Sequence, residues 1–155
     1  MTTATQGFAD WLFVACGVWL IGLGAYFIFV RPPLLPEDLR YAGASAVVLK
    51  AAAPRIVDWL NLVFNVMGGF MAGAGAMVLY LASAVLPTRP RGAALTLGLV
   101  GCATVGFMSV VNFMLHSDFR WLLIVPPVLW AVALGRYVYE GSSRQLIHPA
   151  GHRTS

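Results

Sequence analysis

The chain has 155 residues, of which 59% are hydrophobic and only 10% are charged. A soluble domain carries roughly a quarter charged residues, so the composition argues against a water-soluble domain and indicates an all-α membrane protein. The net charge of +4 comes from basic residues scattered around apolar runs rather than from a basic stripe with interleaved aromatics, which argues against a nucleic-acid partner. Nine of the ten basic residues are Arg, and Ala and Gly are abundant, which favours a bacterial source.

Four apolar runs predict a bundle of four transmembrane helices, because a bilayer core needs about 20 apolar residues in a helix. The predicted spans cover about residues 11–31, 55–86, 92–116 and 119–139. The second span is longest: at 1.5 Å per residue it measures roughly 50 Å against a hydrocarbon core of about 30 Å. It must tilt or protrude, and its least apolar part, residues 54–61, is the expected protruding end.

The loop after the first span begins "RPPLLPEDLR", whose prolines cannot continue a helix interior. Two short helices near the membrane interface are expected there. Pro36 with the carboxylates that follow it has the signature of a first helical turn. Ser45 is the expected cap of the second short helix, over Ala46 to Ala53.

The fourth span is expected to kink at Pro126–Pro127. Residues 1–140 then form one transmembrane domain, and residues 141–155 form a flexible basic tail. Four spans place both termini on one side of the membrane. Each side carries five Lys or Arg residues, so the positive-inside rule does not decide the orientation. We interpret the protein as a multi-pass protein of the bacterial cytoplasmic membrane with cytoplasmic termini.

Polar residues recur on one face of the second span and on one face of the third, each time with spacing i, i+3, i+7. A short turn makes these two spans antiparallel, so both triads are expected on the same side of the membrane and facing each other. We call the six residues the polar rim: Asp58, Asn61, Asn65, Ser109, Asn112 and His116.

Small residues fill the opposite half of the same two spans. Such residues let helix backbones approach closely in lipid, so the two spans are expected to pack tightly there and to open towards the polar rim as a cavity. The expected packing positions are Gly68, Gly69, Ala72, Gly73 and Gly101.

Each polar residue alone has a structural interpretation, because an Asn in a membrane helix often only hydrogen-bonds a neighbour, at about 0.6 kcal/mol on average. As a set they also fit a binding site, since ionisable residues inside bundles mark pathways and sites. His116 is the member that titrates near neutral pH. A lipid-soluble molecule such as a quinone or a lipid is the expected ligand class.

Metal and prosthetic-group chemistry has little support in the sequence. Cys16 and Cys102 form no C-x-x-C pair. His148 and His152 have metal-binding spacing, but Pro149 breaks the helix that would present them. We therefore predict no metal and no resident cofactor, and the sequence contains no recognised catalytic motif.

The second and third spans read "VFNVMGGFMAGAGAMVLYLASAVLPTRPRGAALTLGLVG", and the fourth ends in "LGRYVYEG". This hairpin resembles that of DoxX-like small four-helix membrane proteins over about half the chain. The resemblance implies an accessory or small-molecule-handling role, since some members of that family are subunits of membrane oxidoreductases linked to quinone, and it transfers no catalytic residue.

Two functions follow from these observations. The first is a non-catalytic accessory or scaffold subunit of a membrane complex, whose partners are lipids and either further copies of the chain or another membrane protein. The alternative is a binder or enzyme that acts on a lipid-soluble small molecule through the cavity at the polar rim.

Overall fold

The structure is a computed structural model that describes residues 7–147, with side chains described up to residue 143. This part of the chain consists of helices and turns, without a strand. Four helices are long and apolar enough to cross a membrane: Phe8–Phe29, Ile56–Thr88, Ala93–Met114 and Leu122–Ser143. The prediction of an all-α bundle with four membrane spans is confirmed, and the protein is a small multi-pass integral membrane protein.

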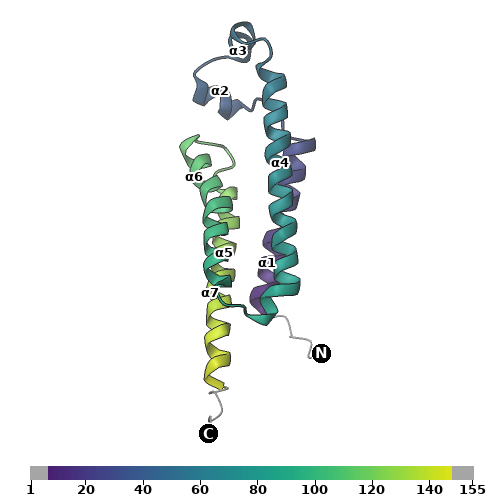
Figure 1. Ribbon diagram of the computed structural model, residues 1–155. Helices are drawn as coiled ribbons and strands as arrows, with labels where there is room; N and C mark the ends of the chain where they lie inside the picture. Colours follow the sequence, from purple (N-terminus) through teal and green to yellow (C-terminus); the bar gives the residue numbers. More distant parts are fainter. Residues whose placement is uncertain (1–6, 148–155) are drawn as a thin grey trace, which may run out of the picture.

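The helices follow one another as a simple up-and-down chain (Figure 1). Three of the four spans contain turns of other helix types at their ends or middles. In order, the elements are α1 (Phe8–Phe29), α2 (Pro36–Ala42), α3 (Ala46–Ala52), α4 (Ile56–Tyr80) with a π-helical turn (Leu81–Val85) and a 3-10 turn (Leu86–Thr88), α5 (Ala93–Gly101), a π-helical turn (Cys102–Gly106), α6 (Phe107–Met114), a 3-10 turn (Leu122–Ile124) and α7 (Val125–Ile147).

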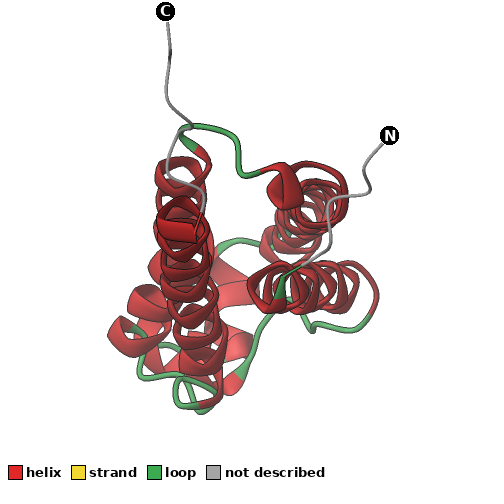
Figure 2. Cartoon of the chain, turned by 90° about the horizontal axis from the view of Figure 1, so that it is seen from below, coloured by secondary structure: helices red, strands yellow, loops and turns green. Residues whose placement is uncertain are grey.

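The spans are arranged as two pairs that meet through α1 and α7. Helix α4 packs along α1, α5 packs on α7, and α1 packs on α7. The second and third spans are therefore not packed neighbours. Figures 1 and 2 show the long helices in two groups. The expected packing between them is wrong, because the first span offers α4 a better-matched surface.

Four glycines line the contact between α1 and α4, and we call them the glycine seam: Gly17 and Gly24 on α1, and Gly68 and Gly75 on α4. A methyl group on Gly24 would lie 2.6 Å from the carbonyl oxygen of Gly68, and one on Gly75 would lie 2.7 Å from the carbonyl oxygen of Gly17. Such contacts exist only because both helices lack a side chain where they cross. The two backbones therefore touch at two levels, seven residues apart on each helix.

The other small residues divide between packing and open positions. Ala72 joins the seam, since a methyl group on Gly24 would meet its amide nitrogen at 2.6 Å. Gly101 lies under Trp130 of α7. Nothing lies within 4 Å of a methyl group built on Gly69 or Gly73, so the prediction that these two are packing positions within the chain is wrong.

Aromatic side chains fill the junction between α1, α5 and α7. Phe13 is fully buried and makes edge-to-face contacts with Trp130 at 5.5 Å and with Tyr137 at 6.4 Å between ring centroids. The indole N–H of Trp130 donates to the carbonyl of Leu97 at 2.9 Å, which satisfies its polar atom inside the core. This junction holds the two helix pairs together.

The seam also sets the depth of the chain in the membrane. Its two glycine pairs place Arg31 level with Asn61, and Asp10 level with Ala82. From Asp10 to Arg31, α1 rises about 31 Å, which matches a hydrocarbon core of about 30 Å. The first turns of α4, from Ile56, therefore extend past the level of Arg31, and their protrusion from the membrane stays a prediction. We call this end of the bundle the rim end, and the opposite end, where α1 begins and α7 ends, the terminal end.

Three local predictions have different outcomes. Ser45 caps α3 as expected, accepting the amide hydrogen of Val48 at 3.3 Å. The kink at Pro126–Pro127 stays a prediction; both prolines lie in the first turn of α7, directly after the 3-10 turn. The tail is wrong for residues 141–147, which continue α7; residues 148–155, including His148 and His152, lie outside the described residues.

Candidate functional sites at the two ends of the bundle

The triad on the second span is exposed at the rim end. Asp58, Asn61 and Asn65 are all exposed, and none of their side chains forms a hydrogen bond with another described residue. The prediction that they face the third span is wrong. Helix α4 packs on α1 instead, and α1 ends at Phe29, so Asp58 and Asn61 extend past the end of α1, whereas Asn65 lies level with its last turn.

Two members of the second triad make structural hydrogen bonds. Ser109 is buried and its hydroxyl donates to the carbonyl of Leu123. That carbonyl has no helical partner, because the residue four positions later is Pro127, which lacks an N–H. Asn112 donates its side-chain amide to the carbonyl of Met108 at 2.9 Å, one turn back on its own helix.

His116 has a backbone role that the sequence did not reveal. Its φ of 50° lies in the left-handed region. Helix α6 ends at Met114, Leu115 is its C-cap, and His116 is the next residue. Its N–H donates to Phe113 at 3.1 Å, and the N–H of Ser117 donates to Asn112 at 3.0 Å. This is the Schellman motif, in which glycine is the usual residue. The imidazole itself is exposed.

The six polar-rim residues therefore lie on separate helix pairs and do not line one cavity. Binding of a ligand by any of them stays a prediction. A shallow apolar groove lies elsewhere, on the face of α4 turned away from α1. We call it the α4 groove; its lining residues are Val66, Gly69, Phe70, Gly73, Ala74 and Met77.

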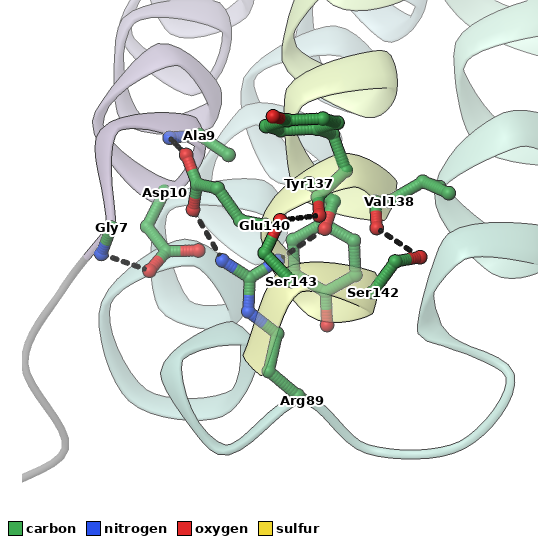
Figure 3. A network of polar contacts seen from close by, with 10 residues as sticks. Gly7, Ala9, Asp10, Arg89, Tyr137, Val138, Glu140, Ser142 and Ser143 are labelled. Atoms are coloured by element: carbon green, nitrogen blue, oxygen red, sulfur yellow. Dashed lines mark hydrogen bonds and ion pairs between the residues drawn. The ribbon is translucent and has the colours of Figure 1, made fainter. Parts of the chain in front are cut away.

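A cluster of charged residues at the terminal end was not predicted. It joins the start of α1, the turn after α4 and the end of α7 (Figure 3). Glu140 accepts the amide hydrogen of Ala9 at 3.2 Å with one oxygen and the guanidinium of Arg89 at 2.5 Å with the other. Arg89 also donates to the carbonyl of Tyr137 at 2.6 Å. We call this set of contacts the terminal latch.

Helix electrostatics explain why two carboxylates gather there. The N-terminus of a helix carries a partial positive charge and free N–H groups. Asp10 accepts the amide hydrogen of Gly7 at 2.8 Å, and Glu140 takes the next free amide from another helix. Asp10 is fully buried. The Asp10 carboxylate, three residues after Gly7, was a readable capping signal, whereas nothing local signals that Glu140, 131 residues after Ala9, accepts the amide hydrogen of Ala9.

Arg89 is held in an unusual conformation by the same contacts. Its φ is 52°, and its guanidinium lies 4.1 Å from the centre of the Tyr137 ring. A left-handed backbone is costly for a residue with a Cβ, so the latch contacts must hold it in place. Three buried atoms of the cluster have no protein partner: Asp10 Oδ1, Arg89 Nε and Tyr137 Oη.

Helix α2 makes polar contacts with both helix pairs at the rim end. On the first pair, Arg31 is largely buried, stacks 3.6 Å from the centre of the Phe64 ring and donates to Asp38 at 3.0 Å. Asp38 also accepts the amide hydrogen of Leu35 at 2.9 Å, which caps α2.

On the second pair, α2 contacts the turn between the third and fourth spans. The buried Glu37 accepts a hydrogen bond from the Ser117 hydroxyl at 3.2 Å. The exposed Arg40 pairs with Asp118 at 2.8 Å. We call α2 with these contacts the α2 strap.

The described residues contain no group of three or more His, Cys, Asp or Glu placed to hold a metal ion. Comparison with protein-family models, curated proteins and solved structures gave no match to this chain.

Proposed function

We propose that the protein is a non-catalytic accessory subunit of a membrane complex and that it binds a transmembrane helix of a partner protein in the α4 groove. The supporting observation is that α4 carries glycines on two faces. Gly68 and Gly75 contact α1 through their backbones, whereas Gly69 and Gly73 face open space. Small residues four positions apart favour close helix association in lipid.

Asn65 gives this face a polar component. By the register of the glycine seam it lies about one turn inside the level of Arg31, at the edge of the hydrocarbon core. It stands four residues before Gly69, so the two lie on neighbouring parts of one face. A side-chain amide without a partner in lipid is unfavourable, and a second helix in the groove would supply the missing hydrogen bond.

The proposal includes location: a bacterial cytoplasmic membrane, with the terminal end in the cytoplasm. It agrees with the resemblance to DoxX-like proteins, which we also retain as a proposal. Binding of a quinone at the rim end is the alternative, favoured by the unpaired side chains of Asp58 and Asn61. It predicts that a quinone with an isoprenoid tail raises the melting temperature of the purified protein, and that Asn61→Ala removes this effect.

A photo-crosslinking amino acid at Phe70, in the middle of the groove, tests the subunit proposal in the native membrane. We expect one protein product, lost in the double variant Gly69→Leu/Gly73→Leu. The matched control is Gly22→Leu/Gly135→Leu, two open glycines on other helices, which should keep the product. Crosslinks to lipid alone, or to many proteins regardless of variant, would overturn the proposal. A product of twice the monomer mass would replace the partner by a second copy of the chain.

A further inference from the structure

The two ends of the bundle are fastened by contacts of different kinds. At the terminal end, the aromatic junction and the terminal latch join the helix pairs through buried groups, with only 15% and 22% of the Arg89 and Glu140 side chains exposed. At the rim end, the spans of the two pairs diverge (Figure 1), and the α2 strap makes the polar contacts that connect them.

We propose that the α2 strap is a releasable fastening, whose opening lets the rim ends of the two helix pairs separate while the terminal latch keeps their other ends together. The bundle then opens sideways to the bilayer at its rim end, with the aromatic junction as the hinge.

The contacts of the strap with the second pair are the ones suited to release. The Arg40–Asp118 pair is exposed, with 56% and 61% of the two side chains accessible. Such a pair is weak and is screened by salt. The remaining contact is the hydrogen bond between Glu37 and Ser117, which are both buried while the strap is closed and become accessible to water when it opens. Since the strap lies beyond the level of Arg31, water is at hand to replace both contacts when they break.

The ion pair between the strap and the first helix pair is less exposed than the Arg40–Asp118 pair, so we expect α2 to stay attached to the first helix pair when the strap opens. Arg31 is only 8% exposed and is held by both Asp38 and the face of Phe64. Gly43 ends α2 in a left-handed conformation that suits glycine, and the following helix, α3, has no buried residue. Helix α2 is therefore anchored to the first pair through Asp38, and the segment that follows α2 carries little packing that would resist movement.

Distance measurements between pairs of spin labels in lipid nanodiscs test the proposal. In a background with Cys16→Ala and Cys102→Ala, labels replace Trp59 and Met114 to report the rim end, and Ala84 and Tyr139 to report the terminal end; all four are exposed. The strap variant is Glu37→Leu/Arg40→Ala, which leaves the turn at Ser117 intact. The matched control is Lys50→Ala on α3.

We expect the strap variant to lengthen the rim distance by more than about 2 Å, the size of ordinary sliding between packed helices, with the terminal distance unchanged. High salt should shift the wild type partway in the same direction. An unchanged rim distance would overturn the proposal. So would a lengthening at both ends, because the strap would then be a general folding contact rather than a fastening of one end.

Discussion

The glycine seam makes a prediction in which one substitution has opposite effects at neighbouring positions. Alanine at Gly68 or Gly75 places a methyl group 2.6–2.7 Å from a backbone oxygen of α1. Ordinary contact begins near 3.4 Å, so α1 and α4 must separate by about 0.8 Å along a surface that backbone contact defines. Alanine at Gly69 or Gly73 meets nothing within 4 Å.

The magnitudes combine two terms. Overpacking costs about 1–3 kcal/mol, and replacing glycine by alanine in a helix gains about 0.8–1 kcal/mol. Gly68→Ala and Gly75→Ala should therefore lower the free energy of unfolding by up to about 2 kcal/mol, from the difference of these terms. Gly69→Ala and Gly73→Ala should raise it by up to about 1 kcal/mol.

Unfolding in mixed micelles of mild detergent and dodecyl sulfate, followed by circular dichroism, measures all four variants on one scale. Equal effects at all four positions would contradict the seam. Destabilisation at Gly69 and Gly73 alone would instead support the prediction that the second and third spans pack on each other.

The same unfolding assay checks three further predictions. His116→Gly should raise the free energy of unfolding by about 1 kcal/mol, because glycine adopts the left-handed conformation without the Cβ penalty; a loss of stability would show that the imidazole makes a stabilising contact. Ser109→Ala should lower it by about 1–3 kcal/mol, since the carbonyl of Leu123 is left without a partner, and wild-type stability would refute this role. Glu140→Gln should lower it by about 1–3 kcal/mol by removing a charge-assisted bond to Arg89, and an equal loss in an Arg89→Ala background would show that the two side chains are not coupled.

The sequence was sufficient for the features that depend on hydrophobicity and local signals. The four spans follow from length and apolar content, and α2 and α3 follow from Pro36 and Ser45. Each of these depends on residues close together in the chain, so no knowledge of the packing is needed to predict it.

The helix pairing could not be read in the same way, because α4 carries small residues on more than one face. Gly69 and Gly73 have the more familiar four-residue spacing, and so do Gly68 and Ala72, so spacing within α4 does not show which face meets α1. The signal for the true pairing was a match between two helices: Gly17 and Gly24 on α1 have the same seven-residue spacing as Gly68 and Gly75 on α4.

The polar rim failed as a unit for a related reason. Shared spacing shows that residues lie on one face of a helix, but it does not show which neighbour that face meets. The Ser109 hydroxyl donates to the Leu123 carbonyl, which Pro127 leaves without a helical partner. His116 stands at the left-handed position just after the end of α6. Neither role depends on a ligand, and both depend on residues outside the triad.

The bond between Ala9 and Glu140 also orders events during biosynthesis. The two residues are 131 positions apart, and at about 5–20 residues per second the ribosome needs on the order of ten seconds to pass from one to the other. Until Glu140 has been made, the first turn of the first span lacks the acceptor that the finished protein supplies to the amide of Ala9. Chains that stop before the fourth span never acquire it, so a free amide at Ala9 distinguishes an incomplete product from a complete one.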